Sequence, residues 1–341
     1  MSSKTYTNGT EALGPTPRYG IWSRFKRNRP AVFGSWILAI VIVLSAIGPA
    51  VFGWLTGISS DYIPSSVENG ALVRSFPPSL AHPMGTDDLG RDLFLRVFEG
   101  GRISILVGIF ASVISLLIGV AYGATAGFFG GRIDGVMMRI VDMLFAIPYL
   151  LIVVVMMSLF GGNNAPDAVK QVTETFVFLT NALMSLAGAS PISTSSGLFQ
   201  IFFLFVALGS VSWLTMARIV RGQVLSLKNE EFILAARSIG VSTFGIVFRH
   251  LIPNISGPVI VYATLTIPSV MLAEAFLSFL GLGVQAPYSS WGSLAADGIK
   301  NIAVYPWQLV FPGLVMGMTL VALNLIGDGL RDAFDPKSSK S

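Results

Sequence analysis

The chain has 341 residues, of which 53% are hydrophobic and 12% are charged, and its formal net charge is +4. A soluble domain of this size would interrupt its long apolar runs with charged residues, so the composition indicates an all-α polytopic membrane protein. Because there is no cysteine, disulfides, thiolate catalysis and cysteine metal sites are excluded. The excess of basic residues is expected to mark cytoplasmic loops rather than a nucleic-acid site.

Residues 1–30 are predicted to form a cytoplasmic N-terminal tail. They are polar, and no apolar region follows Met1, so a cleaved secretory signal is not expected. A first transmembrane helix is predicted over residues 31–53, which are long enough to cross a bilayer. Residues 54–102, rich in Pro, Asp, Ser and Gly, are predicted to form an extracytoplasmic loop. Basic residues cluster before the first span at Arg18, Arg24, Lys26, Arg27 and Arg29.

Acidic residues in this loop raise the question of a metal site. His82, Asp87, Asp88 and Asp92 lie close together in the sequence. The pattern Asp-Asp-x-x-x-Asp lacks the alternating ligands and the glycine of a calcium loop, so no metal is predicted. Instead, Thr86 or Asp87 is expected to cap a short helix that runs toward the second span.

Residues 103–328 are predicted to form the transmembrane core. Its second span, residues 103–128, carries many small residues, which allow membrane helices to pack closely. In the third span, residues 136–160, Arg139 and Asp142 are three apart and are expected to pair with each other. An ionisable residue inside a membrane is also a candidate pathway residue, and this alternative stays open for Asp142.

Residues 161–198 are predicted to form an extracytoplasmic insertion, because their apolar part, residues 175–189, is short for a span. Three further spans are expected over residues 199–217, 255–283 and 308–327, and residues 329–341 form a polar cytoplasmic tail.

Glu274 lies deep in the fifth predicted span. Unpaired, it would cost several kcal/mol there, so it is expected to face the helix bundle or a wet cavity. Two interpretations stay open, a paired or protonated packing residue and a residue of the transport pathway or gate.

Charge asymmetry predicts the orientation of the chain. Basic residues cluster before the first span, around residues 218–249 and in the C-terminal tail. Six spans place all three clusters on one side, so both termini are predicted to be cytoplasmic.

The most informative segment is the polar stretch at residues 229–254, within a predicted cytoplasmic loop at residues 218–254. At helical period, Phe232, Ala235, Ala236 and Ile239 share one face. Ala236 and Gly240 are four apart and are expected to leave a notch of small residues that another protein can approach.

The same stretch carries signals for a turn and a second helix. Gly240 is placed to end the first helix in a left-handed conformation, and Ser242 to cap a second short helix. Pro253 is expected to end that second helix. The sequence therefore predicts a helix-turn-helix between two spans.

These residues resemble the signature cytoplasmic loop of ABC importer permeases, which reads Glu-Ala-Ala, three residues, Gly, nine residues, Ile-x-Leu-Pro. Positions that match are Ala235, Ala236, Gly240 and Pro253. Positions that depart are Leu234, His250 and Ile252, and Glu231, one turn earlier, stands in for the glutamate. The phrases RFKRNRPA, GTDDLGRD and SFLGLGVQAPYSSWG are similar to those of the peptide and nickel permease subfamily.

The resemblance implies a type I ABC importer permease fold with six transmembrane helices in the bacterial plasma (inner) membrane. It implies that the loop at residues 230–253, His250 included, docks onto cytoplasmic ATPases. The implied partners are a homologous second permease subunit, two ABC ATPase subunits, an extracytoplasmic peptide-binding protein and membrane lipid. Peptides are the implied substrate, oligopeptides before dipeptides, although nickel and glutathione importers share the same phrases.

Catalysis by this chain is not expected. No GxxxxGK[ST] phosphate loop occurs, so ATP and Mg are assigned to the partner ATPases and no cofactor to this chain. Its two histidines, His82 and His250, fall on opposite sides of the predicted membrane, which rules out an HExxH motif and argues against a histidine-based membrane hydrolase.

Three alternatives remain at this point. The loop at residues 230–253 is also compatible with an amphipathic helix that lies on the membrane. A secondary transporter or channel driven by an ion gradient would use Glu274 and Asp142, and the inverted repeats typical of that class are not evident. A membrane scaffold without transport activity would leave the loop pattern unexplained.

Overall fold

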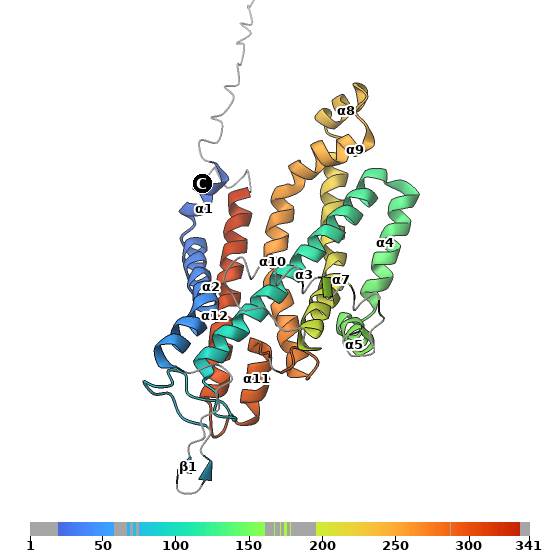
Figure 1. The fold of residues 1–341 in the computed structure, drawn as a ribbon. Coiled ribbons are helices and arrows are strands. Elements are labelled where there is room, and N and C mark those ends of the chain that lie inside the picture. Colours follow the sequence, from blue (N-terminus) through green and yellow to red (C-terminus); the bar gives the residue numbers. More distant parts are fainter. Residues whose placement is uncertain are drawn as a thin grey trace, which may run out of the picture.

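The computed structural model describes residues 20–57, 67–68, 71–72, 75–160, 196–286 and 288–334, together with five single positions between residues 167 and 178. Helices packed side by side make up almost all of this part of the chain (Figure 1). Strands β1 (Val67–Glu68) and β2 (Ala71–Leu72) form a small antiparallel hairpin at one end. The observed fold therefore agrees with the predicted all-α class.

Five helices of the described residues are long and apolar enough to cross a membrane, and the bent pair of α4 and α5 makes a sixth span if it is counted as one. The five are α2 (Arg29–Thr56), α3 (Leu93–Phe129), α7 (Ser196–Leu227), α10 (Ile252–Phe279) and α12 (Trp307–Phe334). The pair consists of α4 (Gly131–Ala146) and α5 (Tyr149–Phe160). The shorter helices are α1 (Ile21–Arg27), α8 (Glu231–Ser238), α9 (Thr243–Gly245), the π-helix η1 (Ile246–Leu251) and α11 (Trp291–Lys300).

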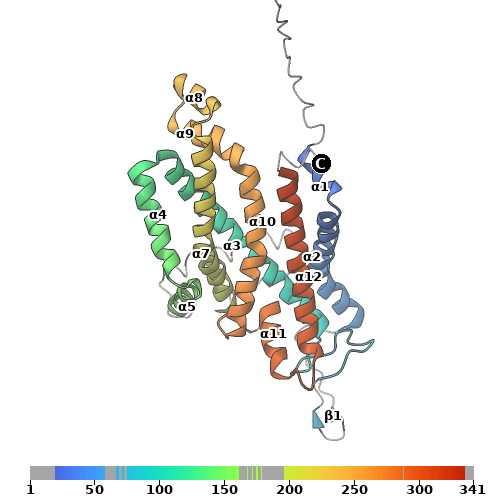
Figure 2. The same ribbon diagram turned by 180° about the vertical axis from the view of Figure 1, so that it is seen from behind.

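The helices form a row in which α2 and α12 lie at one edge and α4 lies at the other (Figure 1, and from behind in Figure 2). Helices α8 and α9 project at the same end of the molecule as α1 and the C-terminal end of α12. The structure thus brings the predicted coupling loop and the two ends of the described chain to one side. That this side is cytoplasmic stays a prediction.

The second span begins earlier than expected, because α3 starts at Leu93 rather than near residue 103. Its cap is Asp92, whose side chain accepts a hydrogen bond of 3.0 Å from the backbone N–H of Leu95. The prediction that Thr86 or Asp87 caps this helix was therefore wrong.

Asp87 instead organises the turn that precedes α3. Its Oδ1 atom accepts the backbone N–H groups of Leu89 (2.9 Å) and Arg91 (2.8 Å). Its Oδ2 atom binds the side chains of Arg91 at 2.8 Å and Arg96 at 2.5 Å. Partners that lie after Asp87 in the chain therefore hold its carboxylate, and one of them, Arg96, lies in the first turn of α3.

Helices α3 and α7 approach each other closely through small residues. Gly119, Gly123 and Gly127 recur every four residues on α3 and face α7. A Cβ atom at Gly127 would lie 2.9 Å from the Cβ atom of Val224, so no larger residue fits there. This contact confirms the small-residue packing face that the sequence predicted for the second span.

The third span is broken, which corrects the prediction of a continuous helix over residues 136–160. Helices α4 and α5 are bent by 82° relative to each other. The break lies at Ile147, whose backbone is extended (φ −84°, ψ 127°), and at the following Pro148. The proline ring disfavours a helical conformation for the residue before it, which explains where α4 ends.

The second helix of the polar loop was predicted to end at Pro253, and this prediction was wrong. The helix continues through η1 into α10. One helical segment runs from Thr243 to Phe279. Pro253 lies at the start of α10, directly after the π-helical turn η1. The π-helical turn just before it rearranges the hydrogen-bond ladder, and the chain passes the proline without stopping.

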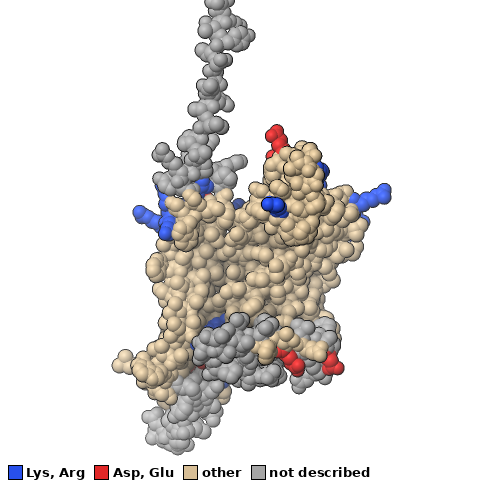
Figure 3. All heavy atoms as spheres, turned by 45° about the horizontal axis from the view of Figure 1, so that its top comes forward, with Lys and Arg blue, Asp and Glu red and all other residues tan. Residues whose placement is uncertain are grey.

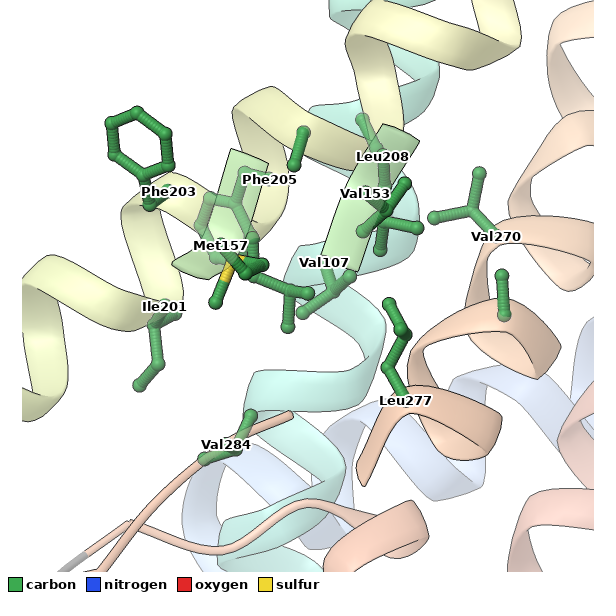
Figure 4. Packing of buried hydrophobic residues seen from close by; sticks show 14 residues of the cluster. Val107, Val153, Met157, Ile201, Phe203, Phe205, Leu208, Val270, Leu277 and Val284 are labelled. Atoms are coloured by element: carbon green, nitrogen blue, oxygen red, sulfur yellow. The ribbon is translucent and has the colours of Figure 1, made fainter. Parts of the chain in front are cut away.

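The core around α5 shows how the bent span is held. Figure 4 shows Val107 of α3, Val153 and Met157 of α5, Leu208 of α7 and Leu277 of α10 gathered in one cluster. Four separate helices thus bury their apolar side chains together at this point.

Several predicted segments lie outside the described residues. These are residues 1–19 of the N-terminal tail, most of the insertion at residues 161–198 with its helix at residues 175–189, and residues 335–341 of the C-terminal tail.

We expect Gly123→Ala to lower the free energy of unfolding of the purified protein in detergent. The added methyl group meets the carbonyl oxygen of Ala217 and the side chain of Val220, and overpacking of this kind costs about 1–3 kcal/mol. The matched control is Gly222→Ala on α7, where a Cβ atom meets nothing within 4 Å. A Gly123→Ala protein as stable as the control would contradict the close packing of α3 on α7.

Candidate functional site

The projecting loop between α7 and α10 is built by two local caps. Helix α8 ends at Ser238, and Gly240, just beyond it, has the left-handed φ of +82° that glycine adopts without strain. The N–H of Val241 then bonds the carbonyl of Ala236 at 3.1 Å, as in a Schellman motif. Ser242 starts the next turn, since its hydroxyl accepts the N–H of Gly245 at 3.2 Å. The predicted glycine stop and serine cap are both confirmed.

Only one residue of the face that Phe232, Ala235, Ala236 and Ile239 were predicted to share is buried. Of the predicted face, Ala236 is buried, whereas Phe232, Ala235 and Ile239 are exposed. Ile233, which sequence reasoning missed, is fully buried and packs in a cluster with residues of α7, η1 and α10. Since α8 has apolar residues on more than one side, periodicity alone did not show which side packs. The expected notch is also not open, because Ala236 is covered.

Five large apolar side chains are exposed on this loop, and we name them together the tip surface. Its members are Phe232, Leu234, Ile239, Phe244 and Phe248. Ile239 is 81% exposed and Phe244 is 70% exposed, and the rings of Phe244 and Phe248 stack with centroids 4.2 Å apart. Figure 3 shows the projecting end as largely uncharged, with a few acidic and basic side chains at its margin. Exposed apolar surface framed by polar residues is typical of a protein interaction site.

The other predicted loop residues lie at the same projecting end. Glu231 and Ala235 are exposed on α8, and Glu231 lies in the first turn, where a negative charge is favourable. His250 is half-buried on η1, and its carbonyl accepts the side-chain N–H of Asn254 at 2.6 Å. Pro253 is exposed at the start of α10. The structure therefore gathers the residues of the predicted coupling loop.

Polar contacts fix this loop to the end of α3. Lys228, just after α7, donates to the carbonyl of Gly127 at 3.0 Å. The guanidinium of Arg237 on α8 lies 5.8 Å from the ring centroid of Phe128. The loop is thus attached to both helices of the close-packed α3–α7 pair.

Helices α4 and α7 are joined by two ion pairs of different character. Asp134, which is buried, receives two hydrogen bonds from Arg221, one of them at 2.7 Å. Asp142 binds Arg218 at 2.7 Å, and both of these side chains are exposed. The guanidinium of Arg218 also lies 4.0 Å from the ring centroid of Phe145.

The expected pair of Arg139 and Asp142 is therefore wrong. The two residues are three apart on α4, but the carboxylate of Asp142 is taken by Arg218 of the neighbouring helix α7. Spacing along one helix did not reveal this partner, because it depends on how α4 and α7 pack.

Glu274 lies in a buried network of hydroxyl groups rather than in an open cavity. It is 1% exposed, and its two carboxylate oxygens accept from Ser278 at 2.6 Å and from Ser104 at 3.3 Å. The hydroxyl of Ser104 in turn accepts the backbone N–H of Trp291 at 3.1 Å, and Ser290 caps α11. Glu274 thus links α10 to α3 and to the start of α11, which favours the packing interpretation.

Asp87, Asp88 and Asp92, which precede α3, each have partners within the protein. His82 binds Asp92 at 2.8 Å, and Asp88 accepts from the side chain of Asn301 at 2.6 Å. Together with Asp87 and its two arginines, these contacts fasten the segment before α3 to the neighbourhood of α11 and α12. This agrees with the structural role that the sequence suggested.

The described residues combine apolar helices that can cross a membrane with ion pairs between helices and one projecting interaction loop. These features define a multi-pass helical membrane protein. Residues 98–340 match the family described as binding-protein-dependent transport system inner membrane component. Residues 16–62 match the N-terminal TM domain of oligopeptide transport permease C. The chain belongs to the binding-protein-dependent transport family.

Relatives agree with this assignment. The chain is 42% identical over 318 residues to the dipeptide transport system permease protein DppC of Bacillus subtilis, covering 93% of this chain and 84% of the relative. It is 41% identical over 341 residues to the oligopeptide transport system permease protein OppC of Escherichia coli K12, covering 98% and 97%. These matches confirm the predicted family, a non-catalytic permease subunit of the inner membrane.

We expect Glu274→Ala to destabilise the folded protein by about 1–3 kcal/mol, because the buried hydroxyls of Ser104 and Ser278 lose their acceptor. Glu274→Gln keeps one acceptor oxygen and should cost less. Unfolding of the purified variants in detergent measures both effects. The control is Asp297→Ala at an exposed pair with Lys300, where no change is expected. Equal stability of Glu274→Ala and wild type would refute the network.

Proposed function

We propose that this chain is the permease subunit of an ATP-driven ABC importer that takes up peptides and that it forms half of the translocation pathway. The observation that carries this proposal is the tip surface, an apolar patch on a projecting helical loop of a chain that belongs to the permease family. An exposed apolar surface of this kind is expected to bind a partner protein. A permease without a nucleotide-binding motif of its own takes its energy from a separate ATPase.

The partners at the tip surface are two ABC ATPase subunits, which bind ATP and Mg. Glu231, Ala235, Gly240, His250 and Pro253 lie in or beside this surface and form the coupling loop. Buried Ala236 supports the loop from beneath. We assign this end to the cytoplasm because α1, with its basic residues, lies there too.

Movement of the tip would be transmitted through continuous helices. The loop follows directly from α7, and its second helix is continuous with α10 from Thr243 to Phe279. An ATPase that binds two arrangements of the tip with unequal affinity would therefore shift the balance between outward-open and inward-open spans.

The remaining partners complete the importer. A homologous second permease supplies the other half of the pathway, and an extracytoplasmic binding protein delivers the peptide. Support comes from the family description, which names dependence on a binding protein.

Oligopeptides are the favoured substrates over dipeptides. The N-terminal match to oligopeptide transport permease C and the nearly complete coverage of the E. coli OppC protein support this preference. A transporter driven by an ion gradient is disfavoured, since Glu274 is enclosed by serine hydroxyls and Asp142 is bound to Arg218.

We expect Ile239→Asp to abolish most ATPase binding and ATP-dependent uptake while leaving the bundle folded. Ile239 is exposed, so a charge there harms an apolar interface and not the core. The measurement is co-purification of ATPases with the tagged chain, followed by uptake in proteoliposomes. Val304→Asp, a matched exposed position at the opposite end, is the control. If the Ile239→Asp chain co-purified with as much ATPase as the wild-type chain, the tip surface would not be the site of coupling.

We expect the reconstituted importer to prefer peptides of three or more residues. Uptake of a labelled pentapeptide should require ATP and the binding protein, and unlabelled tripeptides to pentapeptides should compete better than dipeptides. Nickel should not compete. Stronger competition by dipeptides would move the assignment to a dipeptide importer, and ATP-independent uptake would contradict the importer itself.

A further inference from the structure

The first membrane span and the rest of the bundle match two different family models. Residues 16–62, which include α2, match the N-terminal TM domain, and residues 98–340 match the inner membrane component. Helix α2 packs against α12 and α3 at one edge of the row of helices (Figures 1 and 2). The contacts between these two parts therefore decide whether the first span moves together with the bundle.

Helix α2 contains a proline in its interior, Pro49, and continues beyond it to Thr56. A proline has no backbone N–H, so the carbonyl of Ser45, four residues earlier, loses its donor within the helix. Ser45 is only 3% exposed, and a buried carbonyl without a donor costs free energy. The break at Pro49 therefore needs a hydrogen-bond donor from outside the helix.

Arg102 of α3 supplies the missing donor. Its Nε atom donates to the carbonyl oxygen of Ser45, and its Nη2 atom donates to the carbonyl oxygen of Ala46 at 2.9 Å. Arg102 is half-buried, and within the described residues these two carbonyls are its only hydrogen-bond partners. Its charged group thus binds backbone carbonyls, which is one way in which transmembrane helices accommodate arginine.

The glycine before Arg102 allows α2 to come this close. A Cβ atom at Gly101 would lie 2.6 Å from the hydroxyl oxygen of Ser45 and 2.8 Å from the ring of Trp291. The indole N–H of Trp291 in turn donates to the carbonyl of Val97 on α3 at 2.8 Å. Helices α2 and α11 therefore pack against the same part of α3.

This part of α3 also reaches the buried network around Glu274. Ser104, two residues beyond Arg102, donates to Glu274 at 3.3 Å and accepts the backbone N–H of Trp291 at 3.1 Å. One short stretch of α3 thus contacts α2 through Arg102, α10 through Glu274 and α11 through Trp291.

A second attachment lies at the opposite end of α2. The side chain of Asn28 accepts the backbone N–H of Ala31 at 3.1 Å and donates to Asp332 of α12 at 3.0 Å. Phe25 and Ala31 are buried in one cluster with Ala333 of α12. The first span is therefore fastened to the bundle at two separate points, and Arg102 provides the one that lies farther from α1.

We propose that Arg102 is a clamp for the proline break in the first span, and that it makes α2 move as one body with α3 and with the junction around Glu274. The first span is then a working part of the transport core and not a separate membrane anchor. This inference goes beyond the proposed function, because it concerns how the bundle moves and not what the bundle carries.

A double-mutant cycle tests the clamp by unfolding of the purified full-length chain in detergent. Arg102→Met keeps the length of the side chain but removes its donors, so it should lower the folding equilibrium constant about tenfold. Pro49→Ala returns a backbone N–H to the carbonyl of Ser45. In that background, Arg102→Met should lower the constant only about threefold or less. Pro312→Ala, the matched change inside α12, should leave the tenfold effect unchanged.

An effect of Arg102→Met that is equally large with Pro49 and with alanine at that position would overturn the inference, because the arginine would then not act through the proline break. Wild-type stability of Arg102→Met would overturn it as well.

Distance measurements give a second test, which examines the movement itself. The chain has no cysteine, so Trp54→Cys and Val304→Cys provide a single pair of sites for spin labels. Trp54 lies on α2 beyond the proline and Val304 lies just after α11, and both side chains are well exposed. The distribution of distances between the labels should be narrow in the otherwise unchanged chain, and wider with Arg102→Met.

The same labelled pair reports on the assembled protein. When nucleotide is added to the complex of this chain with its partners, the distance between Trp54→Cys and Val304→Cys should stay the same, because α2 and the junction move together. A distance that changes with nucleotide, or a distribution as narrow with Arg102→Met as with Arg102, would overturn the inference. A chain that purifies without ATPases would instead refute the proposed function, and the measurements on the isolated chain would still test the clamp.

Discussion

The close contact between α3 and α7 is the constraint on which the other features depend. Inside a membrane there is no hydrophobic force between helices, so affinity comes from close packing, and glycines on α3 allow it. The same pair carries the functional parts, because α7 leads into the projecting loop and holds both arginines that bind α4. Contacts of Lys228 and Arg237 with the end of α3 then fix the loop to this pair. A looser α3–α7 contact would leave loop and α4 without a common support.

Polar groups on the helices differ in how completely they are hydrogen-bonded and buried. Glu274 has serine donors on both carboxylate oxygens, and Asp134 has a double contact with Arg221. Both are buried, and their hydrogen-bond partners offset much of the free-energy cost of removing a charge from water. Asp142 and Arg218 have only a single ion pair and remain exposed. In this bundle the buried carboxyl groups are thus the ones with two hydrogen bonds, and the singly paired carboxylate of Asp142 lies where it stays exposed.

Local chemistry made some features predictable from the sequence, and tertiary packing concealed the others. Gly240 and Ser242 act on their own backbone neighbourhood, so their roles as helix stop and helix cap followed from residue type. Pro253 showed the limit of such rules, because a widened turn before it lets the helix continue. The partner of Asp142 and the buried face of α8 depend on which helices lie beside them, and periodicity carries no such information. The resemblance supplied the family, but not the break at Pro148 or the serines around Glu274.

The architecture links both ends of the molecule through one helix. The segment from Thr243 to Phe279 begins at the tip surface and carries Glu274 near its far end, where Ser104 of α3 donates to it and Ser278 joins it to Ser290, the cap of α11. A displacement of the tip surface would therefore strain the buried hydrogen-bond network around Glu274 at the opposite end, rather than being absorbed by a flexible connection. Arg218, on the other helix that leaves the loop, lies between these ends. A rigid movement of the tip surface would then act on both helices that flank the loop, α7 and α10, and through α10 on the far junction.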